Sequence, residues 1–416
     1  MVKRYLELLT VYAPVLGFGF AAVFWGNFGQ SFFIGAFGKS IQESLQLSAA
    51  EYGNAYSAAT VASALTVTWL GGLIDRISLK HYTIGVSMGL FAAMLLMSQV
   101  RHLVTLLLAF YLLRLFGQAL LPHTGITTMA RAFQANRGMA ISIATSGVPA
   151  GEVVLPKLAV TLIAWLGWQS SFLALSMTIP LILLPMALWC LRYGFDDRGQ
   201  LATTLPGPVK SRAHPAGRKA VLRDYRFWLV LPGYMAGPFI VTGIFVHQNA
   251  VVASKDWTLA WFTTGFVVYG LVHWFASLLS GGLVDRFGPV RLLPFFLLPM
   301  VAALFVLALV PGPWSVMAVM ALLAMTIGSS PPISNSLWPD IYGSENLGAI
   351  RSMTVAIMVF ATALSPSLFG YLIDRGVTIQ LLMGGCGFYV LVSCGLMALS
   401  YPLNPRRQLP DSGPDP

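Results

Sequence analysis

Two charged residues lie deep inside long apolar stretches of the sequence, where charge is otherwise rare. Arg114 follows Leu103, the start of one stretch, by 11 positions, and Glu152 precedes Ile163, the end of another, by 11 positions. At about 1.5 Å per helical residue, each would lie roughly 17 Å from a membrane boundary, near the bilayer midplane. A charge at this depth is costly unless it is paired or faces water, so both residues are candidates for a functional site.

Arg114 is the residue that we expect to contact a solute. Its positive charge suits an anionic or carboxyl-bearing molecule, and the alternatives are a gating pair with Glu152 or a salt bridge that only fixes helix packing. Glu152 could instead carry a proton. So could His273, because imidazole ordinarily titrates near neutral pH, although a packing role is the alternative for this histidine.

Other polar residues extend the predicted solute site. Asn27 lies at much the same depth as Arg114, and Gln30 lies one helical turn further out. In the second half of the chain, Tyr269 precedes His273 by four positions and would share its helix face. These residues predict a polar cluster in the first half and an uncharged polar lining in the second.

Lys157 and Asn335 are further candidates for solute contact. Lys157 lies only 6 positions from the predicted outer boundary, so it could bind the solute or extend to the membrane surface. Asn335 follows Pro331 and Pro332, which we expect to interrupt their helix. Interrupted membrane helices often line a pathway, and this is the reason to include Asn335.

The composition places the elements that hold these residues in a membrane. Hydrophobic residues make up 56% of the 416 residues and charged residues 10%, against about 45–50% and 25% in soluble globular proteins. The net charge of +10 comes from cations in short turns, which argues against a nucleic-acid partner. The 3 cysteines lie in apolar runs, and neither a zinc-binding H-E-x-x-H nor a nucleotide-binding G-x-x-x-x-G-K-[ST] pattern occurs, so we predict no cofactor, no metal site and no enzyme.

Twelve apolar segments are long enough to cross a bilayer as helices. They run approximately over 11–37, 53–74, 82–100, 103–130, 138–163 and 170–191, and then over 227–253, 258–284, 290–310, 314–338, 349–373 and 378–402. We therefore predict an all-α integral membrane fold of 12 transmembrane helices in two pseudo-symmetric six-helix bundles. The predicted bundles are 1–191 and 227–403, with a cytoplasmic linker at 192–226 and a disordered cytoplasmic tail at 404–416.

A glycine-rich turn with an acidic and a basic residue supports this division, because it occurs twice. Residues 71–76 read Gly-Gly-Leu-Ile-Asp-Arg, and residues 281–286 read Gly-Gly-Leu-Val-Asp-Arg 210 positions later. The glycines allow close helix packing, and the charged pair could form contacts in one conformation and lose them in another. We predict a conformational latch, with a plain solvated turn as the alternative. The latch would comprise Gly72, Asp75, Arg76, Gly282, Asp285 and Arg286.

The positions of lysine and arginine predict the orientation, because positive residues are retained on the cytoplasmic side. With the N-terminus inside, 19 of the 25 Lys and Arg residues fall on that side. Only Lys39, Arg101, Lys255 and Arg375 fall outside. We therefore expect both termini to be cytoplasmic and the chain to lie in a bacterial inner membrane.

The repeated turn resembles that of the major facilitator superfamily, in which the loop after the second helix has the pattern G-x-L-x-D-R. The resemblance covers nearly the whole chain and implies a solute site at the midplane, exposed alternately on the two sides of the membrane. Arg114 and Gln118, within 111–120, resemble the family's fourth-helix arginine motif, so Gln118 joins the candidate solute contacts. Residues 146–151 partly match its fifth-helix Gly-Pro motif.

Within the superfamily, the stretches 137–156, 166–169 and 222–228 most resemble the monocarboxylate and oxalate-formate branch. The chain departs from monocarboxylate carriers of that branch in two places. It has no acidic-arginine pair in the eighth helix, around His273, and no acidic-glycine signature in the first helix, around Asn27.

These observations predict a secondary active transporter of a small organic solute, anionic or carboxyl-bearing, that works by alternating access with or without proton coupling. The alternative within the class is a proton-antiport exporter of amphipathic compounds or drugs. The alternative from another class is a transport-inactive membrane sensor or scaffold. The expected partners are the solute, the lipid bilayer and protons, and the expected state is a monomer.

Overall fold

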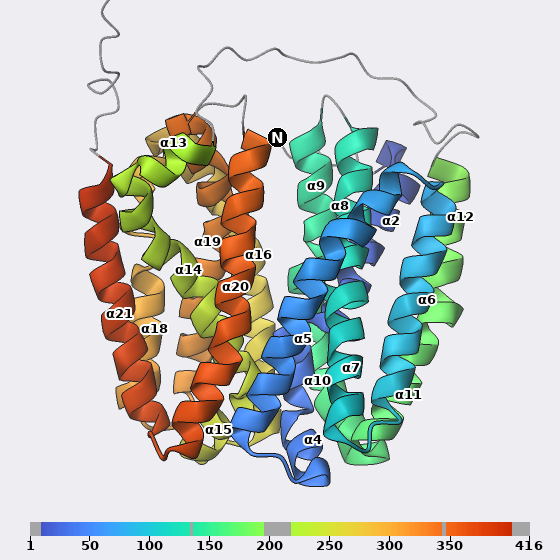
Figure 1. The fold of residues 1–416 in the computed structure, drawn as a ribbon, viewed down its shortest axis with the longest axis horizontal. Coiled ribbons are helices and arrows are strands. Elements are labelled where there is room, and N and C mark those ends of the chain that lie inside the picture. The colour runs from blue at the N-terminus through green and yellow to red at the C-terminus, as the bar shows by residue number, and fades with distance from the viewer. Residues whose placement is uncertain (1–9, 134–135, 195–217, 343–346, 402–416) are drawn as a thin grey trace, which may run out of the picture.

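The computed structural model describes residues 10–133, 136–194, 218–342 and 347–401. Within these ranges every regular element is helical. Figure 1 shows two helical bundles side by side, one coloured blue to green and the other yellow-green to red. The predicted all-α membrane fold of two six-helix bundles is confirmed.

The first bundle consists of six helical runs, several of which are divided by a turn or an irregular stretch. They are α2 (Ala13–Gly26) with η1 (Asn27–Gly29) and α3 (Ser31–Ala36); α5 (Ala49–Leu70) with η2 (Gly71–Asp75); α6 (Leu79–Met97); α7 (Leu103–Leu112) with η3 (Leu113–Leu120) and α8 (Leu121–Ala132); α9 (Arg137–Thr145) with α10 (Gly147–Leu166); and α11 (Trp168–Thr178) with η4 (Ile179–Leu183) and α12 (Leu184–Gly194). The short α4 (Gly38–Leu45) connects the first run to the second.

The second bundle has six runs of its own, preceded by the short α13 (Arg218–Arg223). They are α14 (Tyr225–Val246) with α15 (Gln248–Ser254); α16 (Leu259–Phe287); α17 (Pro289–Leu292) with α18 (Leu298–Leu309); α19 (Ser315–Tyr342); α20 (Leu347–Asp374); and α21 (Ile379–Ser400).

Each of the twelve predicted segments coincides with one of these runs. Among the described residues, 10 helices are long and apolar enough to cross a membrane, and Ala13–Gly29 and Leu298–Leu309 are shorter apolar helices. The first run is short because it is interrupted at Gln30, whose backbone is extended (φ −82°, ψ 152°). The sequence had predicted one uninterrupted helix over 11–37.

The tenth run differs from the prediction in the opposite way, because it is continuous where an interruption was predicted. Pro331 and Pro332 were expected to interrupt it, but both lie inside the continuous helix α19. Prolines are tolerated in membrane helices where neighbouring groups satisfy the backbone carbonyls that they free. Asn335 therefore does not lie beside a helix break, and this prediction was wrong.

The start of α5 is fixed by a capping box. The Ser48 hydroxyl accepts from the backbone N–H of Glu51 at 3.2 Å, and the Glu51 carboxylate accepts from the backbone N–H of Ser48 at 2.9 Å. Thr258 and Thr378 begin α16 and α21 with a similar hydroxyl cap. These caps satisfy backbone donors that have no partner inside the helix, and they fix the direction in which the chain enters each helix.

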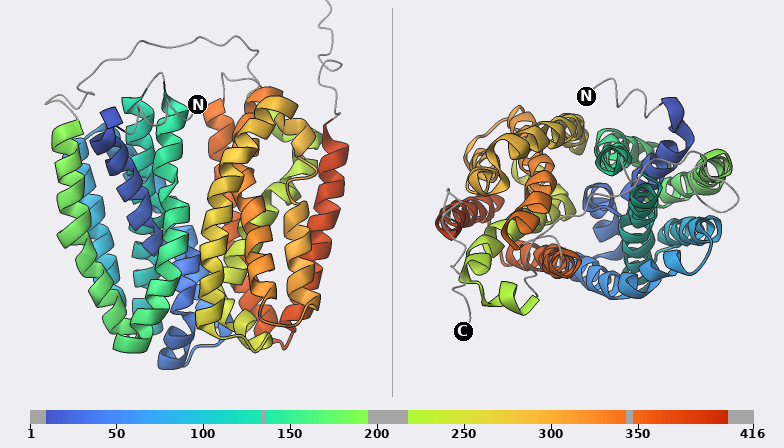
Figure 2. Two further views of the ribbon diagram at one scale, coloured as in Figure 1. Left: turned by 180° about the vertical axis from the view of Figure 1, so that it is seen from behind. Right: turned by 90° about the horizontal axis from the view of Figure 1, so that it is seen from above.

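The two ends of the molecule differ in how the bundles meet. We call the end with Ala13, Gly194 and Tyr225 the terminal face, and the opposite end, with Ala49 and Asp374, the sealed face. Helix α5 packs along α20, and α10 packs along α16. In Figure 1, α5 and α20 lie side by side near the sealed face and separate toward the terminal face, and Figure 2 shows the pair from behind and above.

Glycines bring the bundles together at the sealed face. Gly53 of α5 lies against the backbone of Pro366 in α20, and Gly370 of α20 lies against the backbone of Ala49. Gly270 gives α16 a similar approach to α10. A Cβ atom at any of these positions would overlap backbone atoms of the other bundle. The bundles therefore touch backbone to backbone, as small residues allow in membrane proteins.

Two predicted segments lie largely or wholly outside the described residues. Of the predicted linker 192–226, residues 195–217 are outside them, and the described part includes α13. The predicted tail 404–416 lies outside them entirely. The assigned limits of the bundles, the linker and the tail stay predictions.

Candidate functional site

Arg114 lies where two irregular helical segments of the first bundle meet. It belongs to η3, a π-helical stretch, and η3 packs against η1, where the first run is interrupted. Gly29 of η1 is so close to the backbone of Leu113 and Gln118 that a Cβ atom there would overlap them. Both π-helical turns and broken membrane helices occur frequently at functional positions.

The guanidinium of Arg114 is held by two neutral oxygen atoms. Its Nη1 donates to the hydroxyl oxygen of Tyr56 at 2.7 Å and to the carbonyl oxygen of Gly29 at 3.3 Å. The guanidinium carbon also lies 4.8 Å from the centroid of the Tyr56 ring, within cation–π distance. Arg114 is only 2% exposed. Buried neutral groups thus orient the charge without cancelling it.

Among the described residues, no carboxylate pairs with Arg114. Its Nε is buried and donates to no described acceptor. The contact with Glu152 that the sequence left open is not formed in this structure. Because an arginine side chain stays protonated in proteins, the site holds positive charge with a spare donor.

Glu152 connects the two bundles instead. Its Oε2 lies 2.8 Å from Nδ1 of His273, which belongs to α16 of the second bundle. The Glu152 side chain is 5% exposed and that of His273 is 13% exposed. The rings of Tyr269 and His273 lie 6.0 Å apart, so the predicted shared helix face is present. This contact is a hydrogen bond with neutral imidazole and an ion pair when the ring carries a second proton.

Asn27 joins α2 to α10 through its side-chain amide. Its Nδ2 donates to the carbonyl oxygen of Gly147 at 2.9 Å and to that of Phe24 at 3.0 Å. Gly151 provides the space for this side chain, since a Cβ there would overlap the amide. The Oδ1 is buried and has no hydrogen-bond partner among the described residues, so it can accept from another donor.

The remaining candidates are less enclosed. Gln30 and Gln118 are partly exposed, and neither side chain forms a hydrogen bond within the described residues. Lys157 is exposed on α10 with no ion pair to a described residue, and Asn335 is exposed on α19. The structure therefore gathers Arg114 and Gln118 around η3, whereas Glu152, Tyr269 and His273 form a separate group at the bundle interface.

The predicted latch residues lie at the terminal face and do not cross between bundles in this structure. Asp75 pairs with Arg131 of the same bundle, and both side chains are exposed. Asp285 has no ion pair within the described residues, and a Cβ atom at Gly72 or Gly282 would meet nothing within 4 Å. Arg76 and Arg286 are exposed. The latch stays a prediction about a conformation in which this face is closed.

Sequence reasoning missed a carboxylate that joins the bundles at the sealed face. Asp374, at the end of α20, accepts from the backbone N–H of Ala49 at 3.1 Å and from that of Ala50 at 2.8 Å. A carboxylate at a helix N-terminus satisfies free donors and interacts favourably with the helix dipole. We call this contact the α5 clamp. A signal was present, since residues 372–375 repeat the Leu-Ile-Asp-Arg of residues 73–76.

The fold and the buried charges together define a class of protein. Membrane-crossing runs form two bundles, and the bundles meet beside buried charges, as in multi-pass transport proteins. Within the described residues no cluster of three or more His, Cys, Asp or Glu residues could hold a metal ion.

The chain belongs to the Major Facilitator Superfamily, whose family profile matches residues 16–366. It is therefore a multi-pass integral membrane transporter of a small solute rather than an enzyme. No curated protein sequence matches the chain.

Solved structures support the same fold. A bacterial homolog of the human lysosomal transporter Spinster, in an inward-facing and occupied conformation, is 14% identical and superposes with a TM-score of 0.70 over 94% of this chain and 97% of that one. Its inward-facing, unoccupied form gives a TM-score of 0.69 at 14% identity, over 94% of this chain and 96% of that one. The nucleoside transporter NupG gives 0.68 at 13% identity, over 93% and 100%. Such low identities establish the fold alone.

Proposed function

We propose that this chain is a secondary active transporter of a small organic anion, with Arg114 as its cationic contact. The observation that carries the proposal is the buried guanidinium, which has no carboxylate partner among the described residues. A solute carboxylate would supply the missing negative charge. It would also accept from Nε, which no described group does.

The surroundings of Arg114 support this role. Tyr56 and the carbonyl of Gly29 both accept from Nη1, and Nε donates to no described acceptor. Gln118 lies on the same π-helical segment, and its side chain makes no bond to a described residue. Preorganised donors of this kind bind an anion without first having to break an internal salt bridge.

The arrangement of the bundles supports alternating access. The α5 clamp, the glycine contacts and the Glu152–His273 contact join the bundles from the sealed face inward. We propose that the terminal face is cytoplasmic, as the lysine and arginine positions predict, and that the structure is an inward-facing state. Transport would then require these contacts to break while the terminal face closes, bringing the latch residues together.

We propose that Glu152 and His273 couple transport to protons. A proton on the imidazole strengthens its attraction to the carboxylate, and a proton on the carboxylate weakens it. Because the pair joins the bundles, its protonation state biases the conformational equilibrium. The pair is thus suited to coupling, whereas Arg114 is suited to binding.

We further propose that the transporter is of the monocarboxylate and oxalate-formate branch and that it acts as a monomer in a bacterial inner membrane. The support for it is the resemblance of residues 137–156, 166–169 and 222–228 together with the free cation at Arg114. Neither of the two departures from monocarboxylate carriers removes this cation. The proposed substrate class is therefore small carboxylates, without restriction to lactate-like acids.

A thermal-shift screen of the purified protein tests this proposal. We expect small carboxylates to raise the melting temperature, because a ligand that binds only the native state stabilises it in proportion to occupancy. The shift should disappear in R114A and persist in R101A, which removes one exposed cation from a turn. Stabilisation by amphipathic drugs and by no carboxylate would favour the exporter instead.

A proteoliposome counterflow assay with the best carboxylate separates a transporter from a sensor. Exchange of labelled for unlabelled solute is expected in the wild type and should be lost in R114A. Binding without counterflow would contradict the transport proposal and favour a sensor.

A further inference from the structure

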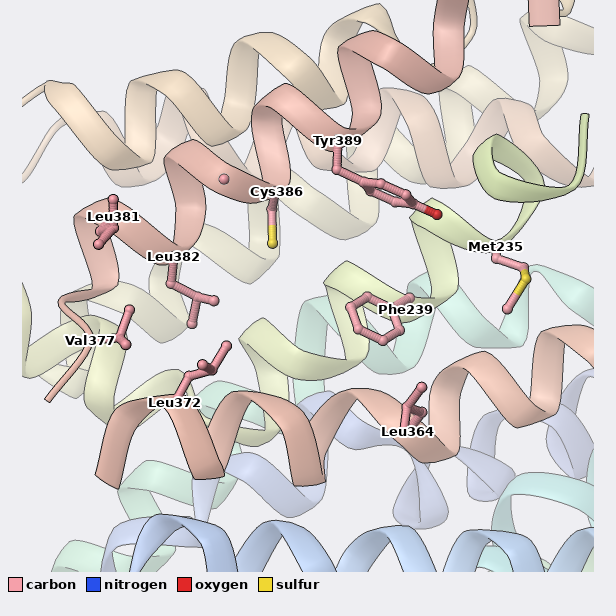
Figure 3. A pocket seen from close by; sticks show the side chains of 10 residues that line it. Met235, Phe239, Leu364, Leu372, Val377, Leu381, Leu382, Cys386 and Tyr389 are labelled. Carbon is pink, nitrogen blue, oxygen red and sulfur yellow. The ribbon is translucent and has the colours of Figure 1, made fainter. Parts of the chain in front are cut away.

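An apolar groove lies on the second bundle, and Arg114 is not among the residues that line it. It is bounded by α14, α20 and α21 and has a volume of about 600 Å³. Figure 3 shows side chains from these three helices around it, with the ring of Tyr389 on one side and Phe239 opposite. Its lining is mostly apolar, with the thiol of Cys386 and the hydroxyl of Tyr389 as the polar groups, and this hydroxyl donates to the carbonyl oxygen of Pro232 at 2.8 Å.

The sequence of α21 creates this groove. Gly385 and Cys386 are small residues between the bulkier Leu381, Leu382 and Tyr389. A Cβ atom on Gly385 would meet nothing within 4 Å, so the helix surface is hollow there. Interior packing normally fills such a space, and an apolar hollow of this size in a water-soluble protein would be costly.

The groove opens to the surroundings of the bundle. Of the side chains that line it, Leu381 is 69% exposed, Leu364 46% and Tyr389 40%. All three lie on helices that cross the membrane. The medium at this surface is therefore lipid hydrocarbon, not water.

The length of the groove corresponds to one leaflet. Along α21 it extends from Val377, just before the helix starts at the sealed face, to Tyr389. Tyr389 lies 10 positions after Ile379, which is about 15 Å at about 1.5 Å per residue and half of a hydrocarbon core of about 30 Å. A transmembrane helix of a partner would need a groove through the full thickness, so one leaflet's depth favours an acyl chain.

A basic residue lies near the end of the groove at the sealed face. Arg375 follows α20 between two residues that line the groove, Leu372 and Val377. Its guanidinium carbon lies 5.1 Å from the centroid of the Tyr371 ring, on a residue that is 50% exposed, and Arg375 is itself exposed. A guanidinium at the level of lipid headgroups suits a phosphate.

We propose that this groove is a phospholipid-binding site, occupied by an acyl chain from the leaflet at the sealed face, with the lipid phosphate at Arg375. The groove is lined by residues of the second bundle and shares no described hydrogen bond with the Arg114 site. The bound lipid would therefore be a structural lipid of the second bundle and not the transported solute. Since its walls come from α14, α20 and α21, the lipid would also hold α20, and with it the α5 clamp, against the rest of its bundle.

Photo-crosslinking of the unaltered protein tests the site directly. The protein would be reconstituted with phosphatidylglycerol that carries a diazirine in one acyl chain, irradiated, and mapped by peptide mass spectrometry. We expect adducts concentrated on Cys386, Tyr389 and Met235. Adducts spread evenly over exposed membrane-facing residues such as Leu279 and Leu399 would overturn the proposal.

Native mass spectrometry with matched variants tests the same site by filling it. In protein reconstituted with phosphatidylglycerol, G385L should retain one lipid fewer than the wild type. G395L, on the same helix and also in open space, should retain the wild-type number. C386F enters the groove from the next position and should reproduce G385L. Unchanged lipid retention in both filling variants would refute the site.

The headgroup contact has its own test. R375Q should lower the retained fraction of phosphatidylglycerol several-fold and that of zwitterionic phosphatidylcholine less, because the choline group offsets the charge of its phosphate. Equal retention of phosphatidylglycerol by R375Q and the wild type would exclude Arg375 as the phosphate contact. Displacement of the lipid by free fatty acid alone, with no effect of R375Q, would contradict phospholipid binding.

Discussion

Arg114 and Glu152 are both buried charges near the middle of the first bundle, but their environments differ. Arg114 is held by oxygens of its own bundle and has no described carboxylate partner. Glu152 reaches His273 of the other bundle. Arg114 thus has no described counter-ion, whereas Glu152 forms a contact between the two bundles.

This difference assigns different roles to two residues that the sequence placed at equal depth. A buried cation without a described counter-ion is stabilised by an anionic solute that binds beside it. A carboxylate that is paired with a residue of the opposite bundle stabilises the present arrangement of the two bundles. The comparison therefore separates recognition at Arg114 from conformational control at Glu152 and His273.

The largest expected effect is at Arg114. Removing one member of a buried charge pair typically costs about 2–5 kcal/mol, so R114A should weaken carboxylate affinity by about 30-fold or more. R114K keeps the charge but loses the planar fork, so its affinity should fall between the wild type and R114A. The measurement is solute affinity and transport in proteoliposomes. Stably inserted R114A that transports normally would exclude the role.

A smaller effect, of about tenfold on the conformational equilibrium, is expected at the Glu152–His273 contact. Acidification that protonates the imidazole should favour the structure described, as long as the carboxylate remains charged. E152Q and H273A should both flatten this pH dependence, and the double variant should add nothing further. The distance between spin labels at the exposed positions Trp69 and Leu279, near the terminal face, reports the equilibrium.

If both single variants keep the pH response of the wild type, these residues are not the proton carriers. Solute affinity provides the contrast with Arg114, because E152Q should change it much less than R114A does. Equal losses of affinity in the two variants would remove the distinction between recognition and control.

The α5 clamp is expected to contribute less, because Asp374 is exposed. Helix caps are worth about 0.5–2 kcal/mol, so D374A should shift the equilibrium several-fold toward opening of the sealed face. E43A removes another exposed carboxylate at the same face, in a pair with Lys39, and serves as the control. A smaller shift in D374A than in E43A would contradict the clamp.

The smallest effect in this conformation is expected at the terminal face. The exposed Asp75–Arg131 pair should be worth at most about 1 kcal/mol, so D75N should change the stability of this state by about fivefold or less. If the latch forms when this face closes, D75N and D285N should both slow transport and leave solute preference unchanged. An altered solute preference would refute the latch.

The fold was predictable because bilayer thickness determines how long an apolar run must be. The twelve segments and the repeated turn at Asp75 and Asp285 follow directly from the sequence. The depths of Arg114 and Glu152 also followed, because depth depends only on counting along a helix. The interruption at Gln30 did not, since its extended backbone depends on packing between η1 and η3.

Side-chain partners were less predictable, because helix rotation and bundle contacts decide them. The sequence does not distinguish Tyr56 from other aromatic residues of α5, because its contact with Arg114 depends on how α5 packs against η3. The similar depths of Glu152 and Arg114 left a contact between them open. In the structure, α16 approaches α10 closely at Gly270, and His273 contacts Glu152 instead. Asp374 carried a sequence signal, the repeated Leu-Ile-Asp-Arg, but only the tertiary contact shows that it caps α5.

A calorimetric titration with the best carboxylate and with its uncharged amide tests whether Arg114 recognises the charge of the solute. We predict that the wild type and R101A bind the acid and reject the amide by about 30-fold or more, and that R114A binds both equally weakly. If R114A keeps the wild-type preference for the acid, the buried guanidinium is a packing element and this transporter does not bind its anion through Arg114.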